Sequence, residues 1–236
     1  SEIVMDVELC VDKEVVSVNL TVLPLVSTEE KRLGSMIMIE DISSKKRMKA
    51  TMSRYMDPGI VDQLLQGDGD ILDGSSTNAT VLFSDIRGFS SITEELGAQG
   101  TVSFLNEYFT IMVECIQDEG GMLDKFIGDA IMAGFGIPVA HGDDEDRAVR
   151  AAVRMISEMW RWNERRLAKG LMPCDMGIGI NTDQVVLGNI GSPKRMDFTM
   201  IGDGVNVAAR LESACKQYSA RLLISENTVN KLRGTF

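Results

Sequence analysis

The stretch from Asp124 to Ala133 has the sequence DKFIGDAIMA, and it predicts the centre of the fold. The apolar pair Met122-Leu123 precedes it, and an apolar run from Ala130 closes it, with Gly128-Asp129 between the two runs. A glycine and an aspartate between two strand-like segments are a hairpin-turn signal. We therefore predict a tight hairpin that holds Asp129 at the edge of a strand.

A second aspartate follows another apolar run. Residues 81–86 are VLFSDI, so Asp85 stands near the end of a short strand-like segment. Taken alone, Asp129 is typical of a turn former and nothing more. Two carboxylates at strand ends can instead share a divalent cation, because hard cations such as Mg²⁺ take oxygen ligands and usually keep substrate phosphates as the others.

Three segments, in order along the chain, resemble the signature blocks of the class III nucleotidyl cyclases. Within that family the resemblance is to the catalytic domain of the bacterial, cyanobacterial-type adenylyl cyclases. The segments are 82–89 (LFSDIRGF), 123–133 (LDKFIGDAIMA) and 197–212 (DFTMIGDGVNVAARLE), and the resemblance covers roughly residue 77 to the C-terminus. It implies an adenylate cyclase that converts ATP to 3′,5′-cyclic AMP and pyrophosphate.

The expected order of helices and strands indicates the fold class. The pattern predicts strand 79–85, helix 99–118, strands 121–126 and 129–135, helix 143–169, strands 175–181 and 184–190, a hairpin tip at 193–195, helix 203–217, strand 221–224 and a short helix from 225. Strand, helix, hairpin, helix, strand is the ferredoxin-like βαββαβ plan. We predict an α+β nucleotidyl cyclase fold, an antiparallel sheet with helices on one face.

Composition excludes several classes of function. The 236 residues carry a net charge of −11, which argues against a nucleic-acid partner, since a basic patch is the expected footprint. No apolar run approaches a membrane span and no signal-peptide pattern opens the chain, so we expect a cytoplasmic protein without membrane insertion. The four cysteines are far apart and predict reduced thiols, neither a zinc site nor a disulfide framework.

The first 77 residues differ in texture from the rest. Segments 15–22 and 34–42 are typical of strands, and the end of the second resembles the last strand of a PAS-type sensor. We predict three parts: residues 1–42 as the C-terminal remnant of a sensor, 43–77 as a signalling helix and linker, and 78–236 as the catalytic domain, C-terminally truncated. The alternative for the first part is an extension that pairs with the catalytic domain or with a second copy.

The helix predicted from residue 43 carries one apolar stripe. Met48, Met52, Tyr55 and Met56 follow helical spacing on an otherwise charged segment. Such a stripe needs a partner, which is either the same domain or a twin helix in a parallel dimer.

The resemblance assigns the metal-binding and phosphate-binding residues. Asp85 and Asp129 match the aspartates that hold two Mg²⁺ or Mn²⁺ ions, and the Ile86 carbonyl would complete one metal shell. Backbone amides from Ile86 through Gly88 to Phe89, near the start of a helix, are suited to receive phosphate oxygens.

The resemblance also assigns a pair that selects the base. Lys125 would donate to adenine N1, and Thr199 would accept from the N6 amino group. Guanylyl cyclases of the family typically carry an acidic residue at the lysine position, so Lys125 favours ATP. Many relatives have Asp where this chain has Thr199, whereas the cyanobacterial-type subset has Thr. Outside the family, Lys125 is typical of a solvated strand residue and Thr199 of a strand filler.

Asn206 and Arg210 stand four residues apart, hence on one face of a helix. In the family they match the residues that orient the ribose and stabilise the charge developing at the α-phosphate. Without the family, both are ordinary surface residues. Family members place the metals on one protomer and this second set on the other, which implies a head-to-tail homodimer that is inactive as a monomer.

One departure and two alternatives remain. The family places a triphosphate-binding lysine on a strand beyond position 236, which implies either a longer polypeptide or impaired activity. The alternatives to an adenylate cyclase controlled by an upstream sensor are a guanylate cyclase, disfavoured by Lys125, and a non-catalytic dimerisation or regulatory module.

Overall fold

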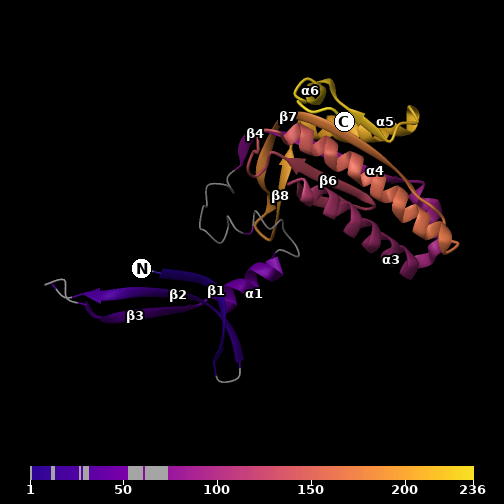
Figure 1. The fold of residues 1–236 in the computed structure, drawn as a ribbon. Helices are drawn as coiled ribbons and strands as arrows, with labels where there is room; N and C mark the ends of the chain where they lie inside the picture. Colours follow the sequence, from indigo (N-terminus) through magenta and orange to yellow (C-terminus); the bar gives the residue numbers. More distant parts are fainter. Residues whose placement is uncertain (1, 12–13, 27, 29–31, 53–60, 62–73) are drawn as a thin grey trace. The chain divides into compact units, whose positions relative to one another are not determined.

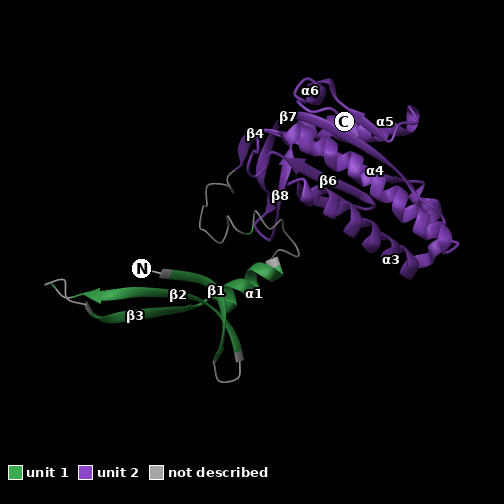
Figure 2. Ribbon diagram, in the orientation of Figure 1, with its two compact units in different colours: residues 1–67 green, residues 68–236 purple. Residues whose placement is uncertain are grey.

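The computed structural model describes residues 2–11, 14–26, 28, 32–52, 61 and 74–236 (Figure 1). The chain divides into two compact units, residues 1–67 and residues 68–236, which Figure 2 colours green and purple.

The first unit contains an antiparallel sheet of three strands in the order β1-β2-β3, followed by helix α1. The bounds are Glu2–Val11 for β1, Glu14–Val26 for β2, Arg32–Asp41 for β3 and Ser43–Met52 for α1. These elements confirm both predicted strands and the predicted helix start. The helix begins beside β2, because the Ser43 hydroxyl accepts a 2.9 Å hydrogen bond from the Ser17 backbone N–H. The predicted continuation past Met52, with Tyr55 and Met56, lies outside the described residues.

The second unit is built on a sheet in the order β5-β6-β4-β7-β8, with β9 parallel to β7 beside it. Its elements are β4 Ser75–Arg87, α3 Phe89–Asp118, β5 Met122–Ile127, β6 Ala130–Phe135, α4 Asp144–Ala168, β7 Asp175–Ser192, β8 Arg195–Ile201, α5 Asp203–Gln217, β9 Leu222–Ile224 and α6 Glu226–Val229. The run from β4 to β7 is a βαββαβ unit whose neighbouring strands are antiparallel. The predicted fold class is confirmed.

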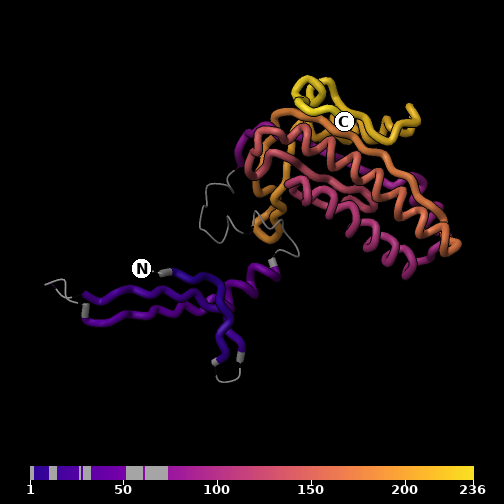
Figure 3. Tube along the Cα trace, viewed as in Figure 1, coloured from indigo at the N-terminus to yellow at the C-terminus, as the bar shows by residue number. Residues whose placement is uncertain are grey.

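Helices α3 and α4 cover one face of this sheet, as expected, and lie side by side in Figure 3. Their shared core buries Tyr108 and Trp162 against Leu82, Ile178 and Ile180. Positions alternate between the two faces along a strand, so Gly177 and Gly179, next to these isoleucines, belong to the opposite face.

That opposite face carries α5, which the expectation of helices on one face did not include. Gly177 and Gly179 of β7 stand under it, and a Cβ on Gly179 would collide with the α5 backbone at Ala208 and Glu212. The two glycines therefore let the helix approach the strand closely.

Strand β7 corrects one prediction. We expected two strands, 175–181 and 184–190, with a break at Thr182-Asp183, but β7 runs unbroken from Asp175 to Ser192. The polar Thr182 is satisfied inside the sheet, because its hydroxyl lies 2.9 Å from the hydroxyls of both Thr80 and Thr228. A polar residue in the middle of a strand was thus wrongly interpreted as a strand end.

Helix α3 also departs from its predicted bounds. It begins at Phe89 and not at residue 99, with non-helical dihedrals at Gly97 (φ 65°, ψ 179°). The glycine interrupts the segment, and only the part after it was predicted from the sequence.

We expect Gly179→Ala to destabilise the second unit by about 1–3 kcal/mol, the usual cost of overpacking a tight contact. The cause is the collision between the new methyl group and the backbone of α5. Thermal denaturation measures the effect, and Gly34→Ala is the control, since Gly34 is a strand glycine with no atom within 4 Å of the added methyl group. Equal melting temperatures for both variants would contradict the close approach of α5.

Candidate active site

The structure brings Asp85 and Asp129 together. Asp85 stands near the end of β4, and Asp129 stands with Gly128 in a two-residue turn, since Ile127 of β5 pairs directly with Ala130 of β6. Gly128 takes φ +65°, a conformation that glycine adopts without strain. Because β4 and β6 are neighbours, the turn places its aspartate beside the end of β4. The predicted hairpin is confirmed.

The two carboxyl groups perturb each other. Burial, and then the charge of Asp85, raise the pKa of Asp129 from its ordinary value of 3.8 to about 6. A side-chain hydrogen bond between the two aspartates adds to this shift, while a hydrogen bond from the Ile86 backbone opposes it. Two ionised carboxylates that are close enough to share a hydrogen bond repel each other, and a cation bound between them would relieve the repulsion.

The start of α3 lies next to this pair. Gly88 occupies the N-cap position with φ 67° and ψ 25°, and no side chain caps the helix. The first backbone N–H groups of a helix have no partner within it, so those near Phe89 are available to an anion. The structure thus places the predicted phosphate-binding segment directly after Asp85.

A third acid, Glu212 of α5, stands near the pair and was not predicted from the sequence. Burial, and then the charge of Asp85, raise its pKa. Gly177, which pairs with Asp85 across the β4–β7 ladder, leaves the space that Glu212 occupies, since a Cβ there would lie 2.9 Å from the Glu212 Oε1. Its nearness depends on how closely α5 approaches β7, which periodicity does not reveal.

Lys125 and Thr199 both contact the carboxylate of Asp124, a residue that was not predicted from the sequence to belong to the site. The Thr199 Oγ1 lies 2.9 Å from Oδ1 and 2.7 Å from Oδ2 of Asp124, and the Lys125 Nζ lies 3.3 Å from the same Oδ1. Asp124 belongs to the hairpin signal, but only the structure shows that its carboxylate joins β5 to β8.

Asn206 and Arg210 lie on the exposed side of α5. The residues that pack inward from this helix include Gly204, Ala208 and Cys215. Among the described residues, no hydrogen bond or ion pair links Asn206 or Arg210 to Asp85 or Asp129. The chain therefore presents the predicted residues in three sets: the paired aspartates, Lys125 with Thr199 at Asp124, and Asn206 with Arg210 on the exposed side of α5.

Comparison with known proteins identifies the family. Residues 73–236 match the family described as the adenylate and guanylate cyclase catalytic domain. The chain belongs to this family.

Relatives of the cyclase domain include enzymes named for both nucleotides. It is 40% identical over 162 residues to an adenylate cyclase of Anabaena cylindrica, covering 67% of this chain and 31% of that protein. Among solved structures, the guanylyl cyclase Cya2 is 40% identical with a TM-score of 0.63, covering 68% of this chain and 81% of that one. The adenylyl cyclase CyaB from P. aeruginosa is 37% identical with a TM-score of 0.63, covering 68% and 82%.

These likenesses establish a cyclase domain. They do not distinguish ATP from GTP, because the relatives include both adenylyl and guanylyl cyclases. The chain spans about a third of the length of its Anabaena relative. In the part of the chain that the structure describes, no helix has both the length and the apolar composition needed to cross a membrane.

The donor set of the cyclase domain fits a divalent cation. Two aspartates and a backbone carbonyl are hard oxygen ligands, which Mg²⁺ and Mn²⁺ accept. Within the described ranges, no cluster of three or more His, Cys, Asp or Glu side chains is arranged to hold a metal. The remaining ligands would therefore come from water and from substrate phosphates.

Arg87 stabilises the surroundings of the site. Its guanidinium donates to Asp175 at 3.1 Å and also to the backbone oxygens of Cys215 and Ala220. It thereby ties the end of β4 to the end of α5, beside a cavity of about 460 Å³ that Gly88 also lines. Arg87, two residues after Asp85, thus has a structural role.

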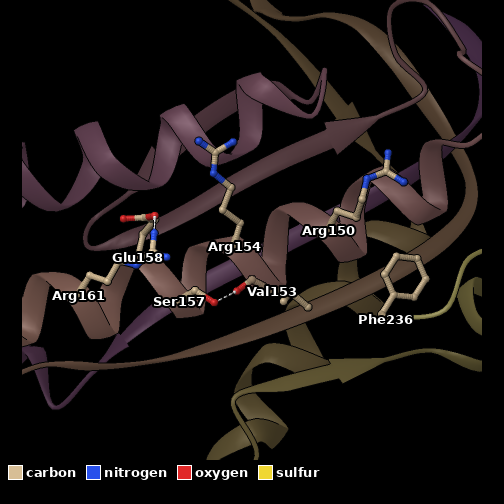
Figure 4. A pocket seen from close by; sticks show the side chains of 7 residues that line it. All are labelled: Arg150, Val153, Arg154, Ser157, Glu158, Arg161 and Phe236. Carbon is tan, nitrogen blue, oxygen red and sulfur yellow. Dashed lines mark hydrogen bonds and ion pairs between the residues drawn. The ribbon is translucent and has the colours of Figure 1, made fainter.

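Another hollow, on the outer side of α4, contains none of the predicted site residues (Figure 4). It has a volume of about 400 Å³, and three arginines line it. All three are paired within the chain: Arg150 with Glu119 and Asp143, Arg154 with Asp118, and Arg161 with Glu158. Charge is neutralised locally here, so this hollow is not a candidate for the active site.

The pKa of Asp129 predicts a pH dependence of stability for the metal-free protein. The folded chain keeps the Asp129 proton up to about pH 6, whereas the unfolded chain releases it near 3.8. Between these values the folded state binds more protons, so raising the pH lowers the free energy of unfolding. We expect Asp129→Asn to remove this decline, and therefore to gain melting temperature over the native chain as the pH rises from about 4 to 6.

Thermal denaturation in EDTA at several pH values measures the difference. The control is Asp197→Asn, a change of the same charge at an exposed position of β8. A gain that is equal at all pH values, or equal in the two variants, would contradict the raised pKa of Asp129.

Proposed function

We propose that this chain is an adenylate cyclase that converts ATP to 3′,5′-cyclic AMP and pyrophosphate. One observation carries the choice of ATP: Lys125 and Thr199 meet at a single carboxylate, 3.3 Å and 2.7 Å away. An ammonium donor next to a hydroxyl matches adenine, which presents an acceptor at N1 and a donor at N6. The guanylate cyclase alternative would need the opposite pattern, and Lys125 disfavours it.

Asp85, Asp129 and the Ile86 carbonyl are proposed to hold two Mg²⁺ or Mn²⁺ ions. The bound ions would lower the pKa of the ribose 3′-hydroxyl and neutralise the triphosphate during in-line attack on the α-phosphorus. The chain's own part is to fix the two carboxylates beside the uncapped start of α3, where the amides from Gly88 to Phe89 receive phosphate oxygens. The side-chain hydrogen bond between Asp85 and Asp129 supports this proposal, because it places the two acids next to each other.

The site is proposed to form between two copies of the chain arranged head to tail. Asn206 and Arg210 are exposed, and neither has a side-chain hydrogen bond or ion pair among the described residues. A planar guanidinium suits the charge that develops at the α-phosphate, and an amide suits the ribose. In a C₂ dimer each copy would contribute its aspartates to one site and its α5 residues to the other.

Residues 1–42 are proposed to belong to a sensor, and the segment from 43 to 77 to connect it to the cyclase domain in a signalling pathway. Exposed apolar side chains on successive positions of β3 support this, with Ile37 64% exposed and Met38 53% exposed. Neighbouring positions point to opposite faces, so both faces of this sheet are apolar. A non-catalytic module remains the alternative from another class, although Asp85, Asp129, Asn206 and Arg210 are all present.

The proposal is tested by measuring product formation from ATP and GTP in parallel, with Mn²⁺ and then Mg²⁺, at several protein concentrations. Cyclic AMP from ATP, with specific activity rising with protein concentration, is the expected result. No product from either nucleotide, in this chain and in one extended at the C-terminus, would support the non-catalytic module.

Mixing inactive variants tests the shared site. Asp85→Ala and Arg210→Ala should each abolish turnover without lowering the melting temperature. Mixed in equal amounts, they should recover about a quarter of the native activity, because half of the exchanged dimers are mixed and each of those holds one intact site.

Two matched controls accompany this experiment. Asp85→Ala mixed with Asp129→Ala should recover nothing, since both changes affect the same half of the site. Turnover by Asp85→Ala alone would refute the metal assignment, and a mixture that stays inactive would refute the exchange of residues between protomers.

A further inference from the structure

Asp124 occupies an irregular position in β5. Leu123 pairs with Ala133 and Lys125 pairs with Met132, so Asp124 is the extra residue of a β-bulge with no partner on β6. A bulge re-aims the side chain of the inserted residue, and bulges are frequent beside active sites. Here the bulge turns the carboxylate away from solvent, because the Asp124 side chain has no exposed surface.

Three donors converge on this buried carboxylate. The Thr199 hydroxyl and the Lys125 ammonium are two of them, and the third is the Met200 backbone N–H, 3.1 Å from Oδ2. An ionised carboxylate only accepts hydrogen bonds, so the single proton of the Thr199 hydroxyl is directed at Asp124. The Thr199 oxygen can therefore offer a ligand only its lone pairs, as a hydrogen-bond acceptor.

This arrangement determines what Thr199 can recognise. A free threonine hydroxyl either donates or accepts, and would tolerate an amino group or a carbonyl at position 6 of a purine. A hydroxyl whose proton is committed to Asp124 can only accept. It pairs with the N6 amino group of adenine and leaves the O6 carbonyl of a 6-oxopurine facing another acceptor.

We propose that Asp124 is the specificity-determining positioning residue of the nucleotide site, fixing Thr199 as an acceptor and holding the Lys125 ammonium beside it so that 6-aminopurines are admitted and 6-oxopurines rejected. The inference rests on the proposed function, which assigns Lys125 and Thr199 to the base. Asp124 acts through these two residues and touches no ligand itself, since it has no exposed side-chain surface.

The test is Asp124→Asn in the 236-residue chain, with ATP and inosine triphosphate as substrates. Inosine triphosphate differs from ATP only at positions 1 and 6 of the base, where it presents an N1–H and an O6 carbonyl. An asparagine oxygen can keep the Met200 N–H, while its NH₂ group donates to the Thr199 oxygen and frees the hydroxyl proton. We expect the ratio of kcat/KM for ATP to that for inosine triphosphate to fall at least about tenfold, within the range that hydrogen-bonding sites supply.

A double-mutant comparison separates positioning from general damage. Thr199→Val removes the hydroxyl that Asp124 orients, so in that background Asp124→Asn should change the ATP preference several-fold less than it does in the native chain. Asp197→Asn, two residues from Thr199 on the same strand, should leave the preference at its native value. Loss of stability in Asp124→Asn would lower both rates equally, so the ratio is compared at a temperature where thermal denaturation shows the variant to be folded. An unmoved ratio in the folded variant overturns the inference.

The native chain supplies a test that needs no variant to fold. Purine riboside triphosphate lacks the 6-amino group and inosine triphosphate replaces it, so both should be poorer substrates than ATP by about tenfold or more. Equal use of ATP and inosine triphosphate by the native chain would overturn the inference.

Binding distinguishes failure of this inference from failure of the proposed function. Calorimetry with the α,β-methylene analogues of ATP and inosine triphosphate reports base preference without turnover. An adenine preference that Asp124→Asn abolishes, in a chain that makes no cyclic nucleotide, supports the inference while the proposed function fails. Turnover of ATP with a preference that Asp124→Asn leaves intact overturns the inference alone, and absence of both binding and turnover overturns both.

Discussion

The pairing of β4 with β7 along the whole of β4, from Ser75 to Arg87, is the constraint on which the cyclase domain depends. It places the last residues of β4 opposite the first residues of β7, so that Asp85 faces a glycine across the ladder. One face of this pair is filled by branched side chains under α3 and α4. The other face has no side chains at Gly177 and Gly179, so α5 can pack close to the backbone of β7. This packing brings Glu212 near Asp85. Core packing and the position of the candidate site thus follow from one strand pair.

The parts that the sequence predicted well are those encoded by local signals. The turn at Gly128-Asp129 needs only a two-residue loop between strands, and the βαββαβ order follows from the sequence of apolar patterns. The break in β7 was wrong because Thr182 is polar in isolation, and only its contacts with Thr80 and Thr228 make it acceptable inside a sheet. The local sequence pattern around Thr182 does not indicate partners as distant in the sequence as Thr80 and Thr228.

The residues missed around the site were missed for the same reason. Glu212 is ordinary on a helical wheel, and its nearness to Asp85 depends on missing side chains in another strand. Asp124 is also ordinary in a hairpin, until a bulge turns it inward and a residue 75 positions later donates to it. Alternation along a strand predicts the wrong side for a bulged residue, so its burial was not visible from the pattern.

The hairpin of β5 and β6 joins both halves of the proposed chemistry. Lys125 follows the bulge at Asp124 within β5, and Asp129 is the second residue of the turn that comes after Ile127. In the proposed dimer these residues would serve different sites, although only three residues separate them. The bulge lies on the side of Lys125 and the tight turn on the side of Asp129. Two distinct local geometries thus adapt one short strand to two tasks.

Burial of Asp124 also has a consequence for how nucleotide preference changes during evolution. Exchanging Lys125 for the acidic residue typical of guanylyl cyclases would set a second carboxylate against one that is already sealed from solvent, and like charges at such range destabilise each other. That exchange of Lys125 would therefore cost stability at the same step at which it changes the contacts with the base. A lineage that neutralises Asp124 first would meet no such barrier. The order of substitutions, and not only their identity, is thus constrained by one concealed carboxylate.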